Sequence, residues 1–273
     1  MQSQALTKIP TAKPPSVGAL VRHWRQLRRM SQLDLACEAD ISTRHLSFIE
    51  TGRSAPSRDM VLHLAESLGV PIRERNALLL AAGYAPAFQA RDLSDPVLRP
   101  VREAIDALLS AHEPFPALAV DRHWILIAAN RAVAPLTAGA APELLKPPVN
   151  VMRLSLHPQG VAPRIANLAE WRDHLLFRLR RQHADSADAA LGALIEELAA
   201  YPCGPSRPRS ADSLASALAV PLRLKTESGI LSFLSATMMF DASLDATLSE
   251  IALETFLPAD AETAAALRLK PAS

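Results

Sequence analysis

Residues 31–53 have the sequence SQLDLACEADISTRHLSFIETGR, which predicts two short helices joined by a tight turn. Ser31 is placed to cap the first helix, and the carboxylate three residues later can return a hydrogen bond to the cap. Ser42 is placed to cap the second helix, predicted over 43–51. Gly52 ends that helix, because glycine tolerates a positive φ.

The second predicted helix has an apolar and a polar side. Leu46 and Ile49 face inward, which leaves polar side chains near the amino-terminal end pointing outward: Thr43, Arg44, His45 and Ser47. Helices that bind the major groove of DNA present their amino-terminal residues to base edges, and arginine can form two hydrogen bonds to guanine. The pattern therefore predicts a DNA-binding unit. The alternatives are that Arg44 is a surface arginine with no partner and that His45 caps the helix surface.

The formal net charge of the chain is only +1, but charge is unevenly distributed. From Met1 to Leu33 every charged side chain is basic: Lys8, Lys13, Arg22, Arg25, Arg28 and Arg29. Local basicity of this kind favours contact with phosphates, although a solvated helix face gives the same pattern.

Three more helices flank this unit in the sequence. Apolar residues at helical spacing predict helices over 17–29, 57–68 and 71–82. Ser57 is placed to cap the second of these, and Pro71 suits the first turn of the third. Five short helices can share one small core.

The segment 17–83 resembles the five-helix DNA-binding domain of the Cro/C1-type, or Xre-type, helix-turn-helix regulators. The Ser-Gln opening at residue 31, the Leu-Ala pair that follows and the Ile-Glu-x-Gly-Arg close all match. Residues 41–86, ISTRHLSFIETGRSAPSRDMVLHLAESLGVPIRERNALLLAAGYAP, resemble one branch of that family, the MmyB-like transcriptional regulators. Arg29 departs from the pattern, since many family members have glycine there, and this bears on the geometry of the turn.

The resemblance implies that eight side chains contact double-stranded DNA: Gln32, Ser42, Thr43, Arg44, His45, Ser47, Arg53 and Arg58. Those of the second helix would lie in the major groove, while Gln32, Arg53 and Arg58 would hold phosphates and so position the domain without recognising sequence. Glu50 would repel phosphate, so we expect it to pair with Arg25 or Arg28.

The length of 273 residues favours more than one domain. A flexible tail is predicted over 1–16, a linker over 84–95 and a second domain over 96–273. That domain should begin with a helix over 96–111, which has an apolar side formed by Val97, Val101, Ile105 and Leu108.

Short apolar runs on either side of Asp121–His123 predict a β-hairpin, and long amphipathic helices are predicted over 164–183 and 187–200. An exposed loop, 204–212, comes next. Three strands, 219–226, 230–240 and 246–258, and a last helix, 260–269, complete the chain. Two strands, a block of helices and three antiparallel strands is the order of an α+β PAS-like domain. The whole chain is therefore predicted to be multidomain, with an all-α domain first.

Four tracts resemble the ligand-binding domain of the same MmyB-like regulators: FPALAVDRHWILIAANRAVAPL, NVMRLSLHP, NLAEWRDHLL and LSEIALETFLPAD. The resemblance implies a small, largely apolar or fatty-acid-like ligand. Six aromatic or polar side chains in otherwise apolar segments are candidates to line its pocket: Trp124, Asn130, Arg153, His157, Arg164 and Trp171. Either Arg153 or Arg164 would bind a ligand carboxylate. The alternatives are that both tryptophans are core residues, that His157 caps a loop and that Asn130 caps a helix.

Several function classes find no support in the sequence. It contains no Gly-x-Ser-x-Gly motif, glycine-rich phosphate loop or dinucleotide fingerprint, so no enzyme activity and no cofactor are expected. No histidine pair has the His-x-x-x-His spacing of a helical zinc site, so no metal is expected. Two distant cysteines, Cys37 and Cys203, fit the reducing cytoplasm. No apolar run reaches the roughly 20 residues that cross a bilayer, and no membrane partner is expected.

The sequence thus predicts a cytoplasmic, sequence-specific transcriptional regulator, expected to act as a homodimer because two recognition helices one DNA turn apart recognise a palindrome. The alternative is a ligand carrier or an antitoxin-like interaction module whose DNA binding is secondary and weakly specific. Salt dependence separates the two, because specific binding keeps its preference over random DNA as salt rises.

Overall fold

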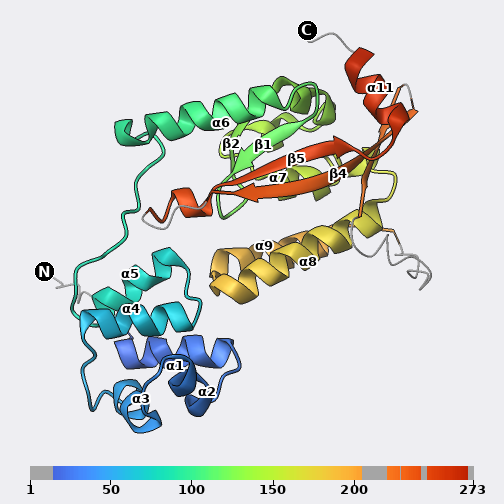
Figure 1. Cartoon of the computed structure of the whole chain (residues 1–273). Helices are drawn as coiled ribbons and strands as arrows, with labels where there is room; N and C mark the ends of the chain where they lie inside the picture. The colour runs from blue at the N-terminus through green and yellow to red at the C-terminus, as the bar shows by residue number, and fades with distance from the viewer. Residues whose placement is uncertain (1–14, 205–219, 228, 241–244, 270–273) are drawn as a thin grey trace, which may run out of the picture. The chain divides into compact units, whose positions relative to one another are not determined.

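The computed structural model describes residues 15–204, 220–227, 229–240 and 245–269. The chain divides into two compact units, with the division between Gln89 and Ala90 (Figure 1). The predicted tail up to residue 14, and the predicted loop from residue 205 to residue 212, lie outside the described residues. None of the described helices is long and apolar enough to cross a membrane.

The first unit consists of five short helices, as predicted: α1 (Val17–Leu27), α2 (Gln32–Glu38), α3 (Thr43–Glu50), α4 (Arg58–Ser67) and α5 (Ile72–Ala81). The predicted caps are confirmed for α2, α3 and α4, since the side chains of Ser31, Ser42 and Ser57 each accept a hydrogen bond from a backbone N–H of the first turn. Asp34 returns a bond to the backbone of Ser31 and completes the capping box. Each cap satisfies a backbone donor that the helix itself leaves unpaired.

Gly18 lets α1 lie directly against α3. A Cβ atom built at Gly18 would overlap the backbone carbonyl oxygen of Ile49 and lie 2.8 Å from that of Glu50. Both of these residues are buried, as is Leu46 one turn earlier in α3. The hydrogen atom of a glycine is therefore what allows the two helices to approach this closely.

Arg29 lies in the turn between α1 and α2 with a φ of +55°, in the left-handed region. A Cβ atom makes this conformation unfavourable by about 1–2 kcal/mol, whereas glycine adopts it freely. The departure from the family pattern at this position therefore leaves strain in the turn.

We expect Arg29→Gly to raise the free energy of unfolding by about 0.5–1 kcal/mol, since relief of the strain exceeds the added entropy of the unfolded chain. Urea denaturation followed by circular dichroism measures the change. Gln26→Gly, at an exposed helical position of α1, is the matched control and should destabilise by about 1 kcal/mol. Equal destabilisation by both substitutions would contradict the prediction.

The second unit contains an antiparallel sheet of five strands: β1 (Ala117–Val120), β2 (Leu126–Ala129), β3 (Leu222–Thr226), β4 (Gly229–Met239) and β5 (Ala252–Pro258). The order across the sheet is β2-β1-β5-β4-β3. The helices among its described residues are α6 (Arg99–Ala111), α7 (Val151–Leu156), α8 (Leu168–Ser186), α9 (Ala189–Ala200) and α11 (Ala261–Leu269). Short 3₁₀ turns are η1 (Pro96–Leu98), η2 (Arg131–Leu136), η3 (Pro142–Leu145), η4 (Ala162–Arg164) and η5 (Leu248–Glu250). The predicted α+β PAS-like domain with an antiparallel sheet is confirmed.

The two faces of the sheet carry different cores, because side chains alternate along each strand. On β1, Leu118 and Val120 pack into the larger core with α7, α8 and α9. The intervening Ala117 and Ala119 pack against α6 on the other face. In Figure 1, α6 runs along β1 and β2, away from the pair formed by α8 and α9.

Two helices of the second unit differ from prediction. The buried face of 96–111 is formed by Leu98, Ile105 and Leu109, whereas Val97 and Leu108 are exposed. The segment opens with the 3₁₀ turn η1, whose tighter winding shifts the side chains relative to an ideal α-helix. The helix predicted from residue 164 begins at Leu168, because the backbone of 165–166 instead pairs with β3: Ile165 bridges Leu224 and the N–H of Ala166 donates to the carbonyl of Arg223.

Candidate nucleic-acid interface and ligand cavity

The amino-terminal half of α3 presents its polar side chains to solvent. Ser42, Thr43 and Arg44 are exposed, and His45 and Ser47 are half-buried. The hydroxyl of Ser42 accepts a hydrogen bond from the backbone N–H of His45 at 3.1 Å, so this part of Ser42 serves the helix cap. The opposite side of α3 is fully buried in the core of the unit. The helix is thus anchored by one side and offers the other to a partner.

Phe48 brings two of the predicted DNA-contacting arginines together. The guanidinium carbons of Arg44 and Arg53 lie 5.3 and 5.9 Å from the centre of the Phe48 ring. Among the described residues, neither arginine forms an ion pair with a carboxylate, so their charges are available to phosphates or bases. The sequence prediction did not include Phe48, although its spacing of four from Arg44 on a helix was a usable signal.

Glu50 is the polar centre of the first unit. Its side chain has no exposed surface and accepts hydrogen bonds from Arg25 at 2.7 and 2.9 Å, from Gln32 at 2.8 Å and from Arg22 at 3.3 Å. Burial alone would raise the pKa of Glu50, but the bonds from Arg25, Gln32 and Arg22 outweigh it and hold the pKa below its ordinary value of 4.5. The same contact raises the pKa of Arg25.

The prediction that Glu50 pairs with Arg25 or Arg28 is confirmed for Arg25. Arg28 instead donates to the backbone carbonyls of Leu68 and Gly69, each at 3.0 Å. These carbonyls lie at the end of α4, where the helix leaves acceptors unpaired. Gln32 lies at the start of α2, half-buried, with its amide nitrogen on Glu50.

The two remaining predicted anchors lie on the surface. Arg53 follows α3, and its backbone N–H donates to the carbonyl of Phe48 at 2.8 Å, which closes the helix end. Arg58 is the first residue of α4 and is exposed. Of the eight predicted DNA-contacting side chains, Gln32 is the one whose amide is bonded to a buried carboxylate in this structure.

The second unit contains a cavity of about 310 Å³ between the sheet and the helices of its larger core. Its walls are mainly aliphatic and aromatic, with side chains from β1, β2, α7, α8, β3 and β5. Among the side chains that line it are Leu118, Trp124, Asn130, Val149, Met152, Leu154, Ser155, Trp171, Leu175, Arg178, Leu224, Glu254 and Phe256. Three of the six predicted ligand-contacting residues, Trp124, Asn130 and Trp171, thus line this cavity.

The other three predicted residues are not among those that line the cavity. Arg153 donates to both carboxylate oxygens of Glu197 at the surface, with contacts of 2.7–3.0 Å. Arg164 donates to backbone carbonyls, the nearest being that of Ala138 at 2.8 Å. The ring of His157 accepts a hydrogen bond from the N–H of Gln159, so its predicted capping of a loop is confirmed.

Asn130 supports the strand rather than the helix it precedes, so its predicted capping role is wrong. The amide of Asn130 donates to the carbonyls of Leu109 and Phe115, and its oxygen accepts from the N–H of Ala117. It makes no cap hydrogen bond to η2. These three bonds tie α6 to the first residue of β1.

An ion pair that sequence reasoning missed lies at the cavity wall. Arg178 on α8 donates to both oxygens of Glu254 on β5, at 2.9 and 2.8 Å, and its guanidinium carbon lies 4.9 Å from the centre of the Trp124 ring. Arg178 lies within the helix predicted over 164–183 but was not among the six residues predicted to contact the ligand. The two partners are 76 residues apart in the sequence, so no local pattern joins them.

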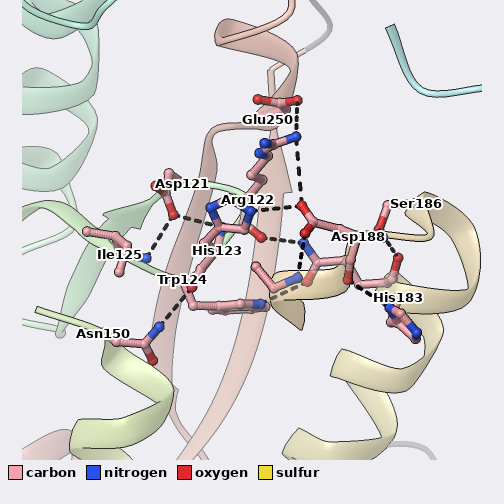
Figure 2. A network of polar contacts seen from close by, with 12 residues as sticks. Asp121, Arg122, His123, Trp124, Ile125, Asn150, His183, Ser186, Asp188 and Glu250 are labelled. Carbon is pink, nitrogen blue, oxygen red and sulfur yellow. Dashed lines mark hydrogen bonds and ion pairs between the residues drawn. The ribbon is translucent and has the colours of Figure 1, made fainter. Parts of the chain in front are cut away.

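A polar network holds the β1–β2 turn against the start of α9, as Figure 2 shows. The ring of His123 contacts the carboxylate of Asp188 at 2.8 Å, and Arg122 lies 3.8 Å from the same carboxylate and 3.6 Å from Glu250. Burial acts to raise the pKa of Asp188, but the bonds from His123 and the backbone outweigh it, so the pKa is lowered. Trp124 follows directly, with a φ of +64°.

The orientation of Trp124 is fixed by the side chain of Gln182. The indole N–H donates to the amide oxygen of Gln182 at 2.8 Å, and the amide nitrogen of Gln182 donates to the carbonyl of Arg122 at 2.7 Å. Both bonds join the turn to α8. Trp124, part of the cavity wall, is therefore held by hydrogen bonds to the end of α8 that precedes α9.

Two family models match this chain, one in each of its two units. Residues 101–269 match the family model described as the MmyB-like transcription regulator ligand binding domain. Residues 21–75 match a helix-turn-helix model.

Two curated relatives are similar to this chain over a short region. They are the uncharacterized HTH-type transcriptional regulators Rv0023 of Mycobacterium tuberculosis H37Rv and Mb0023 of Mycobacterium bovis. Each is 37% identical over 67 residues, which is 24% of this chain and 26% of the relative. The chain therefore spans about a quarter of the length of these relatives.

One solved structure is described as an RNA-binding Light-Oxygen-Voltage receptor. The match between the two covers 92% of this chain and 60% of the receptor chain. It is 13% identical with a TM-score of 0.27, a likeness too weak to carry a conclusion.

Proposed function

This chain belongs to the MmyB-like transcription regulators, and we propose that it is a cytoplasmic, sequence-specific regulator whose DNA binding responds to a small apolar ligand. In this proposal α3 enters the major groove, and the cavity of the second unit holds the ligand. The protein acts as a homodimer on a palindromic operator, because two recognition helices one turn of DNA apart multiply specificity.

The strongest support is the exposed amino-terminal half of α3. Thr43 and Arg44 project from a helix whose other side is buried, which is the geometry that a recognition helix needs. Arg53 and Arg58 lie outside this helix and would bind phosphates, with Gln32 as a further anchor.

The proposal is tested by selecting bound sequences from random duplex DNA with the full chain, and by footprinting the region upstream of its own gene. We expect a palindromic site to be enriched, and its preference over random DNA to persist as salt rises. Equal binding to all sequences would favour the alternative, a ligand-carrying or interaction module with secondary DNA binding. Mass spectrometry of small molecules that co-purify with the protein tests the ligand.

We expect Arg44→Ala to relax the base preference at one operator position and to cost about 1–3 kcal/mol in operator binding, because the guanidinium can bond both acceptors of a guanine. The measurement is a binding-site selection with the variant, followed by gel-shift titration. Arg58→Ala is the control for a phosphate contact. It should weaken binding to all DNA sequences alike and reduce the slope of log affinity against log salt concentration by about 0.9. If the Arg44→Ala variant selected the same DNA sequence as the native chain, Arg44 would have no role in base recognition.

Phe48 should act as a positioning residue for two arginines. We expect Phe48→Leu to weaken operator binding about fivefold, because two cation–π contacts of about 0.5–1 kcal/mol each at an exposed site are lost. Phe48→Tyr keeps the ring and should bind nearly as the native chain does. Gel-shift titration measures the affinities, and thermal unfolding checks that both variants fold. Equal affinity of the Leu variant and the native chain would rule out this role.

A further inference from the structure

The cavity contains one ion pair and, among the described residues that line it, no other ionisable side chain. Besides its two bonds to Glu254, Arg178 donates to the hydroxyl of Thr237 at 2.7 Å, and that hydroxyl donates to Glu254 at 3.0 Å. Glu254 is only 4% exposed. Its carboxylate therefore has three donors already, and the cavity carries no net charge.

Most other polar groups of the wall are also bonded within the protein. Asn130 uses its amide on three backbone groups, and the indole N–H of Trp124 is bonded to Gln182. The hydroxyl of Thr137 donates to the carbonyl of Ala134 at 3.0 Å. The hydrogen-bonding groups of these side chains are thus used within the protein, and few of them are free to bind a ligand.

Ser155 is different. Its oxygen accepts the indole N–H of Trp171 at 3.1 Å, and the part of the chain that the structure describes holds no acceptor for its own hydroxyl proton. A guanidinium carries five N–H donors, so Arg178 also keeps donors beyond those on Glu254 and Thr237. Both groups line the cavity. What the wall lacks is therefore a hydrogen-bond acceptor, which the ligand can supply.

That acceptor is best supplied by an uncharged group. A ligand carboxylate beside this ion pair would add a third charge to a neutral, largely apolar pocket, or would displace Glu254 from Arg178 and leave a buried carboxylate without its cation. Either arrangement costs several kcal/mol. A carbonyl oxygen accepts the same hydrogen bonds without that cost.

The volume sets the size of the ligand. An apolar cavity of roughly 150 Å³ binds benzene. On that scale a cavity of about 310 Å³ holds roughly a dozen non-hydrogen atoms.

We infer that the cavity binds an uncharged, largely apolar molecule of roughly a dozen non-hydrogen atoms. Its carbonyl group, in an ester, a ketone or an amide, accepts a hydrogen bond from the Ser155 hydroxyl, and it enters the cavity without disturbing the pair of Arg178 and Glu254. The inference rests on the proposed function in one respect, that the cavity is the ligand site.

Two isomers and one alkane test this inference. Methyl nonanoate and decanoate contain the same heavy atoms and differ at neutral pH in charge, and dodecane of equal size has no acceptor. Titration of the full chain is followed by tryptophan fluorescence, in which Trp124 and Trp171 of the cavity wall report on the ligand and Trp24 of the first unit gives a constant background. We expect methyl nonanoate to bind at least about 100-fold more tightly than decanoate, because the decanoate charge enters without a partner.

Two variants locate the interactions. Ser155→Ala should lower the affinity for methyl nonanoate about tenfold, since one hydrogen bond is lost, and should leave the affinity for dodecane unchanged. Glu254→Gln keeps the shape of the side chain but leaves Arg178 without its counter-charge, so decanoate should now bind more tightly than methyl nonanoate.

Decanoate binding to the native chain as tightly as methyl nonanoate would overturn the inference while leaving the cavity as the ligand site. Unchanged binding of methyl nonanoate by Ser155→Ala would overturn the role of Ser155. If none of the three probes bound, both the inference and the cavity as the site of ligand control would fail, whereas operator selection would still test the DNA-binding part.

Discussion

Glu50→Ala should lower the free energy of unfolding of the first unit by about 3–5 kcal/mol, the loss expected when one partner of a buried ion pair is removed. Its side chain is fully buried, and three side chains donate to it. Arg25, with 11% of its side chain exposed, would keep a charge with no carboxylate partner. Gln32 and Arg22 would lose an acceptor at the same time.

Thermal and urea denaturation of the full chain, followed by circular dichroism, measure this loss. The midpoint of the unfolding transition of the first unit should be lower in the variant than in the native chain. Glu66→Ala, at an exposed position of α4, is the matched control and should change stability by less than about 0.5 kcal/mol. A loss below about 1 kcal/mol for Glu50→Ala would mean that Arg25 finds another partner.

The pH dependence gives a second readout of the same contact. The folded pKa of Glu50 lies below its ordinary value of 4.5, so the carboxylate contributes stability above pH 4.5 that is lost as pH falls through the folded pKa. We therefore expect the difference in stability between the native chain and Glu50→Ala to be greatest above pH 4.5 and to shrink on further acidification.

Gly18→Ala should lower the free energy of unfolding by about 3 kcal/mol, at the upper end of the range for overpacking a core. The added Cβ atom meets backbone carbonyls of α3 rather than the end of a flexible side chain, so the helices themselves must separate. Because α3 also carries Thr43 and Arg44, the shift should weaken operator binding as well.

Gly204→Ala is the control for this substitution. Among the residues that the structure describes, no heavy atom lies within 4 Å of a Cβ atom built there, so stability should be nearly unchanged. Thermal unfolding and gel-shift titration of both variants provide the comparison. If Gly18→Ala unfolded at the native temperature, the close approach of α1 and α3 would not be needed for the fold.

Local sequence signals predicted the first unit well, because its helices begin and end at residues whose own chemistry sets the boundary. Ser31 and Ser42 are caps in any context, and Gly52 ends α3 with a φ of +72°. The same signals could not show which carbonyls lie beside Gly18, since that depends on how α1 crosses α3.

The cavity shows where sequence reasoning stops. Trp124 and Trp171 stood out by composition, and both line it. Arg153 and Arg164 stood out equally, yet one pairs with Glu197 and the other caps backbone carbonyls. The ion pair in the wall depends on the register that places Glu254 opposite Thr237, which only the folded sheet defines.

The division of α3 into a buried and an exposed side has a consequence for how such a regulator can diverge. Thr43 and Arg44 are exposed and contribute little to the core, so under the proposed function substitutions there would change the operator without loss of the fold. Gln32 is different, because its amide holds the buried Glu50 while its position at the start of α2 suits a phosphate. Under the proposed function, duplicated genes would therefore acquire new target promoters through Thr43, Arg44, His45 and Ser47, while Leu46, α1, α2 and the contacts of Glu50 stay the same.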